Sequence, residues 1–158
     1  MKILGTLLAV LVLSGVALAQ EELTDADKQL ITAIQAAGGQ AELTPFIEDT
    51  EQAFSDADLI ICRAGASTVT EIAAVGAAAL FVPFPSAVDD HQTTNANFLV
   101  AQGGGWLLQQ RDLTPEKLSI MLQKTERLTL VQRALHAKNM QNIDATAHLV
   151  AACAELAR

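Results

Sequence analysis

The hydrophobic and polar residues alternate between short apolar runs and longer segments of mixed polarity. Leu59-Ile60-Ile61-Cys62 and Ala79-Leu80-Phe81-Val82 are continuous apolar runs, which is the pattern of a strand that is covered on both faces. Residues Trp106 to Leu108 predict the last strand, and a short strand is expected from Ala41 to Thr44. Strands with two covered faces are typical of parallel sheets, so these runs predict an α/β fold.

The segments between these runs carry helix signals. A helix that begins after Thr24 and ends at Gly38-Gly39 has an apolar face around Ile31 and Ile34. Thr114 followed by Pro115 predicts an N-cap and a first helical residue. Further helices are expected around Ala53 to Ala57, from Ser67 to Val75, through Leu99 after a loop from Phe84 to Asp90, and again from Asp144. The alternation of strand and helix predicts a Rossmann-like parallel sheet with flanking helices.

The first part of the chain, residues 1–20, has a different character. One lysine precedes an uncharged stretch from Ile3 to Ala19, which ends in the small-x-small pattern Ala17-Leu18-Ala19. This pattern is typical of a secretory signal peptide, so we expect export to the periplasm and no contribution of the segment to the sheet. The alternative is a buried strand or helix, and in that case deletion of the segment destabilises the fold. Residues 24–158 are expected to form the folded domain.

Composition and charge narrow the class of protein. The chain has 158 residues, 51% of them hydrophobic and 18% charged, which is typical of one folded domain and not of a disordered chain. The net charge of -8 argues against nucleic acid as a partner. Cys62 and Cys153 have no metal-ligand spacing, so no metal site is expected, and no cofactor is indicated.

Ligands of open α/β sheets bind beyond the carboxyl ends of the strands, which directs attention to the loops after Cys62 and Val82. In the first loop, Ser67 and Thr68 begin a helix whose free N–H groups attract phosphate, and Glu71 can accept both hydroxyls of a ribose. The alternative is a capping box, in which Glu71 bonds only to the backbone of Thr68.

The second loop has the sequence FPSAVDDHQTTNA, with Asp89 or Asp90 at a helix start and His91 and Gln92 in its first turn. Polar side chains at this position can bond the hydroxyls of a sugar. The alternative is that Asp90 caps the helix while His91 and Gln92 are simply solvated. The spacing alone leaves both interpretations open.

From Asp27 to its end the sequence closely resembles the C-terminal part of the MurG family. MurG enzymes are UDP-N-acetylglucosamine-dependent transferases that make lipid II from lipid I in peptidoglycan synthesis. The passages that carry the resemblance are QAELTPFIEDTEQAFSDADLIICRAGASTVTEIAAVG, AALFVPFP, DDHQTTNA and GGGWLLQQRDLTPEKL.

The resemblance implies part of the C-terminal, donor-binding domain of a GT-B glycosyltransferase. It implies contacts with UDP-N-acetylglucosamine from Ile47 at the uracil, from Ala66, Ser67 and Thr68 at the diphosphate and ribose, from Glu71 at the ribose hydroxyls, and from His91 with Gln92 at the N-acetylglucosamine. It implies no catalytic residue in this part of the chain.

The family's acceptor domain has no counterpart in this sequence, so the chain is expected to be a hexosyltransferase by family but inactive alone. Lipid I is expected as a partner only when that domain is supplied. The family works at the cytoplasmic face of the inner membrane, which conflicts with the export predicted for residues 1–20. An exported, non-enzymatic remnant or binding module on the same α/β fold is the alternative function.

Overall fold

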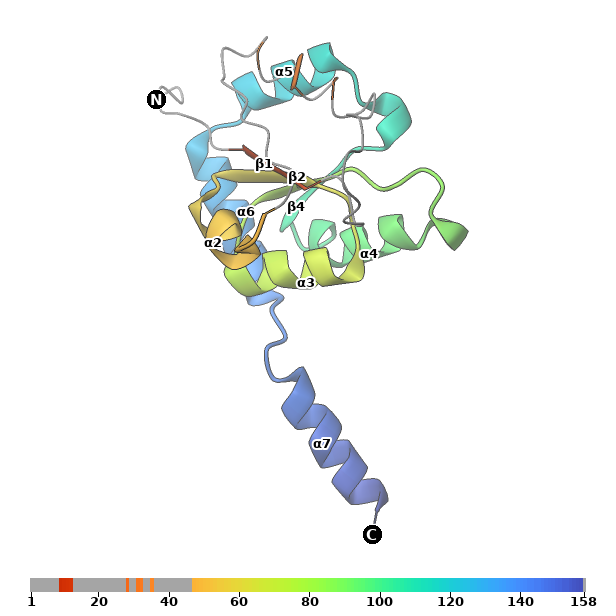
Figure 1. Cartoon of the computed structure of the whole chain (residues 1–158). Helices are drawn as coiled ribbons and strands as arrows, with labels where there is room; N and C mark the ends of the chain where they lie inside the picture. The colour runs from red at the N-terminus through yellow and green to blue at the C-terminus, as the bar shows by residue number, and fades with distance from the viewer. Residues whose placement is uncertain (1–8, 13–27, 29–30, 33–34, 36–46, 158) are drawn as a thin grey trace.

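The computed structural model describes residues 9–12, 28, 31, 32, 35 and 47–157. Their strands form one four-stranded parallel sheet in the order β1-β2-β3-β4, with helices on both faces (Figure 1). The strands are β1 (Ala9–Val12), β2 (Leu59–Cys62), β3 (Ala79–Phe81) and β4 (Gly105–Leu107). The predicted α/β class is confirmed.

The two central strands are buried on both faces, as their apolar runs predict. Successive side chains of a strand point to opposite faces, so each run supplies two separate cores. Ile60, Cys62 and Phe81 lie in one core, whereas Ile61 and Leu80 lie in the other. A parallel sheet covered in this way has no face on which a polar side chain can be solvated.

Six helices are described over their full length, and all but the last of them pack against the sheet. They are α2 (Thr50–Asp56), α3 (Ala66–Val75), α4 (His91–Val100), α5 (Pro115–Lys124), α6 (Arg127–Asn139) and α7 (Ala145–Leu156), and two short 3₁₀ turns are η1 (Val88–Asp90) and η2 (Gln110–Asp112). Helices α2, α3 and α4 contribute to the first core and α5 to the second. Helix α6 reaches both, through Ala137 in the first and Leu130 in the second.

Local capping explains where several helices begin. The Asp49 carboxylate accepts a hydrogen bond of 2.8 Å from the Gln52 N–H at the start of α2. The Thr114 hydroxyl accepts one of 3.2 Å from the Lys117 N–H, and Pro115 is the first residue of α5, as predicted. Asp144 is the N-cap of α7, which confirms the predicted restart.

Helix α7 has no buried residue and projects away from the sheet and its covering helices (Figure 1). Among the residues that the structure describes, no helix combines the length and apolar character that a membrane crossing requires.

The N-terminal segment differs from its prediction. Ala9–Val12 forms the edge strand β1 and pairs with β2 in parallel, with Ala9 opposite Leu59 and Val12 opposite Cys62. The expectation that the segment takes no part in the sheet is therefore wrong, and export receives no support. An uncharged apolar run is compatible both with a signal peptide and with a buried strand, because neither of them needs an amphipathic periodicity.

Two other predicted elements lie wholly or mainly outside the described residues. The strand expected from Ala41 to Thr44 is one of them. Of the helix expected after Thr24, only residues 28, 31, 32 and 35 are described, and all four are helical.

The glycine run before β4 is a close-packing feature. Gly105 pairs with Ala79 of β3, and a Cβ added at Gly105 would lie 2.7 Å from the Ala79 carbonyl oxygen. Arg133 of α6 donates hydrogen bonds to the carbonyls of Gly103 and Gly105, at 3.3 and 2.6 Å, and its guanidinium lies 4.0 Å from the Trp106 ring centroid. These contacts of Arg133 therefore join α6 to the glycine run and to the start of β4.

We expect Gly105→Ala to destabilise the fold by about 1–3 kcal/mol, because the added methyl group must displace backbone of the neighbouring strand. The control is Gly65→Ala, whose added carbon meets nothing closer than the Thr68 hydroxyl at 3.7 Å. Denaturant unfolding of both variants measures the difference. Equal stabilities of the two variants would contradict the packing argument.

The two thiols are expected to differ in reactivity. Cys62 is buried and Cys153 is exposed on α7, and burial raises the pKa of Cys62 to about 12. The thiolate is the reactive form, so a disulfide reagent at pH 8 should modify Cys153 rapidly and Cys62 only after denaturant is added. Two fast thiols in the native protein would show that the first core is open to solvent.

Candidate functional site

The loops that follow β2 and β3 leave the sheet side by side at its carboxyl edge. Cys62 lies opposite Phe81 in the strand register, and the Val82 N–H donates a hydrogen bond of 2.8 Å to the Cys62 carbonyl. The first loop leads directly into α3 and the second into η1 and α4. The fold therefore brings together the two loops in which the sequence predicts most of the site.

The N-terminus of α3 offers free backbone donors. Its N-cap is Gly65, which makes no side-chain capping hydrogen bond, and the first intrahelical bond runs from the Val69 N–H to the Gly65 carbonyl at 3.0 Å. The N–H groups of Ala66, Ser67 and Thr68 precede that bond, so the helix gives them no carbonyl partner. Such an end, with the positive pole of the helix dipole, suits an anion.

The capping-box alternative for Glu71 is wrong. Thr68 lies inside α3 and is not its cap, because the helix already begins at Ala66. Glu71 is exposed in the second turn of the helix. Its carboxylate is therefore not used to close the helix end and remains accessible at the surface.

Gln92 joins the two loops. Its Oε1 accepts hydrogen bonds from the backbone N–H of Ala64, at 3.2 Å, and of Phe84, at 2.9 Å. Asn95, one turn further along α4, donates from Nδ2 to the Ala64 carbonyl at 3.1 Å. Gln92 is half-buried, so the alternative in which it is simply solvated is wrong.

Arg63 makes a second connection between the loops. Its Nη1 donates hydrogen bonds to the carbonyls of Val82, at 3.1 Å, and Pro83, at 3.2 Å. Its guanidinium carbon lies 5.4 Å from the Phe84 ring centroid, within the range of a cation–π contact. A half-buried positive charge therefore stands at the carboxyl edge.

Arg63 and Asn95 are not among the predicted site residues. A charged residue directly after a buried strand is one sequence signal for Arg63. For Asn95 the signal is its spacing of three from Gln92, which places both side chains on one helix face.

The start of α4 is held by side chains. Asp89 and Asp90 have φ angles of 53° and 51°, in the left-handed region that few residues other than glycine adopt. Asp90 occupies the N-cap position, but instead of a backbone N–H its carboxylate accepts the Thr93 hydroxyl at 2.6 Å. Gln109 Nε2 donates in turn to the Thr93 hydroxyl at 3.0 Å. The predicted backbone cap by Asp90 is therefore absent. In its place, side-chain hydrogen bonds connect Asp90 through Thr93 to Gln109, which follows β4.

The remaining predicted residues lie on different elements. His91 is the exposed first residue of α4, beside Gln92. Ile47 is half-buried just before Asp49, the N-cap of α2, and α2 packs against α3. The contacts predicted for these residues with sugar and uracil stay predictions.

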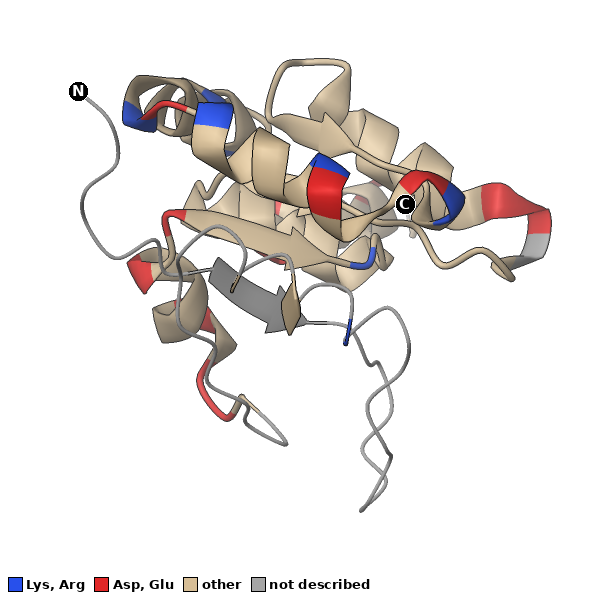
Figure 2. Ribbon diagram, turned by 90° about the horizontal axis from the view of Figure 1, so that it is seen from above, with Lys and Arg blue, Asp and Glu red and all other residues tan. Residues whose placement is uncertain are grey.

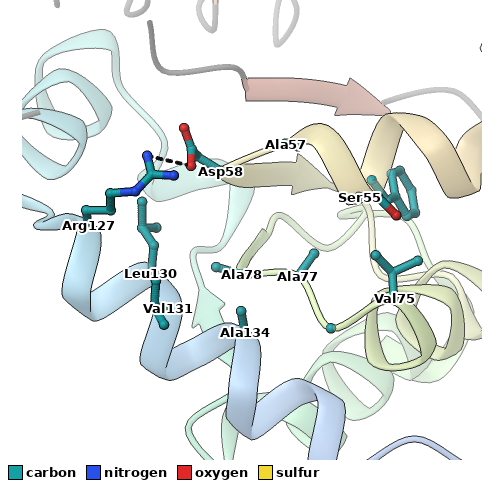
Figure 3. Close-up of a pocket in the computed structure, with 12 residues that line it drawn as sticks. Ser55, Ala57, Asp58, Val75, Ala77, Ala78, Arg127, Leu130, Val131 and Ala134 are labelled. Atoms are coloured by element: carbon teal, nitrogen blue, oxygen red, sulfur yellow. Dashed lines mark ion pairs between the residues drawn. The ribbon is translucent and has the colours of Figure 1, made fainter. Parts of the chain in front are cut away.

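A pocket of about 240 Å³ lies elsewhere, between the ends of α2 and α3 and the side of α6 (Figure 3). Asp58 and Arg127, joined by an ion pair of 2.9 Å, and the apolar side chains of Leu130 and Val131 are among its lining residues. Asp58 directly precedes β2, so the pocket lies at the amino edge of the sheet. None of the predicted site residues lines it.

Charged residues lie on the helices and loops, and the described strands carry none (Figure 2). Within the described ranges, no group of three or more His, Cys, Asp and Glu side chains is arranged to hold a metal ion.

The model of the glycosyltransferase family 28 C-terminal domain matches residues 9–150, which is most of the chain. The chain belongs to glycosyltransferase family 28. The match begins at β1, inside the segment in which the sequence suggests a signal peptide.

Relatives in this family are similar over three quarters of the chain. An N-acetylglucosamine transferase that acts on N-acetylmuramyl-(pentapeptide) pyrophosphoryl-undecaprenol, from Polaromonas naphthalenivorans, is 85% identical over 123 residues. The alignment covers 78% of this chain and 34% of the relative. The protein of the same name from Burkholderia thailandensis is 53% identical and covered to 33%. The chain therefore spans about a third of the length of these relatives.

Two solved structures are similar to this chain. The crystal structure of Acinetobacter baumannii MurG matches with a TM-score of 0.66 at 47% identity, over 78% of this chain and 38% of that one. The kitacinnamycin glycotransferase shares the fold, with a TM-score of 0.56 at 14% identity over 95% of this chain. The resemblance to the C-terminal part of the MurG family, and with it the GT-B type of fold, is confirmed.

Proposed function

We propose that this chain is the donor-binding part of a UDP-N-acetylglucosamine-dependent N-acetylglucosaminyltransferase, a hexosyltransferase of lipid II synthesis. The observation that carries the proposal is the uncapped N-terminus of α3 at the carboxyl edge, with exposed Glu71 one turn further along the helix. This end of the helix offers hydrogen-bond donors to a diphosphate and an acceptor to ribose hydroxyls. The relatives that share the family are named for transfer of N-acetylglucosamine.

In the proposed complex each part of the donor meets a different element. The diphosphate accepts hydrogen bonds from the N–H groups of Ala66, Ser67 and Thr68, and Glu71 accepts the ribose hydroxyls. His91 and Gln92 contact the N-acetylglucosamine from the start of α4. The backbone of Ile47, before α2, contacts the uracil.

The same donors serve the chemistry. In the transfer, an acceptor hydroxyl forms a bond to the anomeric carbon, the bond from that carbon to the β-phosphate oxygen breaks, and a base removes the hydroxyl proton. Negative charge develops on the departing UDP, and N–H groups fixed at a helix end stabilise it. The resemblance places the base and the lipid I site in the acceptor domain, outside the third of the relatives that this chain matches.

A cytoplasmic location at the membrane follows from the proposed substrates. Uridine nucleotide donors are cytosolic, whereas the acceptor named for the relatives is carried on undecaprenol, a membrane lipid. We therefore infer that the reaction takes place at the cytoplasmic face of the membrane.

We expect the 158-residue chain to bind UDP, and Glu71→Gln to weaken that binding by roughly tenfold, because a hydrogen bond to a charged group is replaced by a weaker one. Binding of 2′-deoxy-UDP should change much less, since one of the assigned hydroxyls is missing. Calorimetric titration of both nucleotides measures the contrast.

The matched control for this titration is Glu116→Gln, an exposed glutamate on α5 at the other face of the sheet. It should leave both affinities unchanged. Equal losses for UDP and 2′-deoxy-UDP in Glu71→Gln would remove the ribose assignment, and no binding by the unsubstituted chain at millimolar UDP would overturn the proposed function.

The 158-residue chain alone should transfer no N-acetylglucosamine to a lipid I analogue. Transfer requires the acceptor hydroxyl and its base to be held against the anomeric carbon, and this alignment accounts for much of the rate. A radiolabelled donor assay measures product formation. Acceptor-dependent product that is lost in Glu71→Ala would show that residues of this chain complete the active site.

A further inference from the structure

Helix α4 holds both backbone polar groups of one loop residue. The Ala64 N–H donates to Gln92 Oε1 at 3.2 Å, and the Ala64 carbonyl accepts from Asn95 Nδ2 at 3.1 Å. Ala64 is fully buried and belongs to the first core. Buried backbone groups need partners, so these two side chains satisfy groups that the turn after β2 leaves without a strand or helix partner.

The orientation of the Gln92 amide is fixed by the same contacts. Two backbone N–H groups, those of Ala64 and Phe84, point at one atom of Gln92. Only the oxygen of an amide can accept from both, so this atom is Oε1. Gln92 therefore ties the β2–α3 loop to the β3–α4 loop, while Asn95 ties the first loop to α4 itself.

These bonds act close to the proposed diphosphate donors. Ala64 is separated from Ala66, the first residue of α3, only by the N-cap Gly65. Gly65 has no side chain with which to fix its own position. The two hydrogen bonds at Ala64 therefore contribute to the position of the α3 N-terminus relative to α4, together with the packing of the two helices in the first core.

We propose that Asn95 is a positioning residue of the donor site, which acts with Gln92 to hold Ala64 and thereby the N–H groups of Ala66, Ser67 and Thr68. The inference rests on the proposed function and adds a residue to which no ligand contact is assigned. Asn95 need not touch the nucleotide. Its loss leaves a buried carbonyl without a donor and lets the turn before α3 move.

The test compares Asn95→Ala with Asn97→Ala in the full 158-residue chain. Both substitutions place alanine in the same helix, but Asn97 is exposed on its surface. Asn95→Ala should weaken UDP binding by roughly tenfold, whereas Asn97→Ala should not. Thermal unfolding of both variants shows whether any loss of affinity follows global stability instead.

Nuclear magnetic resonance gives a local readout that a general structural role would not produce. Asn95→Ala should shift the carbonyl resonance of Ala64 and the amide resonances of Ala66, Ser67 and Thr68, with α5 unchanged. Wild-type UDP affinity in folded Asn95→Ala, or unshifted amides at the start of α3, would overturn the inference. If the unsubstituted chain binds no UDP, the proposed function fails, and the resonances alone decide the positioning role.

A second pair of variants tests the inference even if Asn95→Ala does not fold. Gln92→Glu keeps an oxygen at the position of Oε1, whereas Gln92→Leu has none. Hydrogen exchange of the Ala64 and Phe84 amides should be about tenfold or more faster in Gln92→Leu and close to wild type in Gln92→Glu. Equal exchange in the two variants would show that α4 does not hold these loops.

Discussion

The central constraint on this structure is that β2 and β3 are buried on both faces. Every side chain of these strands faces one of two apolar cores, so the sheet itself has no place for a polar group that binds a ligand. Polar chemistry is therefore confined to the strand ends. The parallel register brings Cys62 and Phe81 to the same edge, and the loops that follow them form one surface.

Loops that leave a parallel sheet need connections to hold a defined geometry, because the strand ladder ends where they begin. Here Arg63 donates hydrogen bonds to carbonyls just after β3, and Gln92 accepts hydrogen bonds from one backbone N–H group of each loop. These bonds satisfy backbone groups that the strand ladder leaves without partners. The same bonds that complete the fold therefore also hold the turn before α3, which links the stability of the edge to the geometry of the proposed donor site.

The sequence predicts strands β2, β3 and β4 and most helices because their signals are local, as at Thr114-Pro115 and Asp144. Prediction from the sequence is wrong where the same residue pattern is compatible with two different structures. The apolar run that contains β1 suits a signal peptide equally well, and Thr68 with Glu71 has capping-box spacing although Gly65 is the cap. The hydrogen bonds of Asn95 and Arg63 join residues far apart in the chain, so the local sequence signals at these two residues do not identify their partners.

A net charge of -8 raises the question of how this chain would attract a diphosphate. At physiological ionic strength charges are screened over about 8 Å, so distant carboxylates contribute little at the α3 N-terminus. Whether an anion is attracted there depends mainly on the donors within hydrogen-bond reach. At this edge the donors are backbone N–H groups at the positive end of a helix dipole, and the Arg63 guanidinium lies at the same edge. Backbone donors cannot titrate and carry no side-chain entropy to lose. An acidic protein can therefore hold an anion at this edge, provided that the turn before α3 is kept in place.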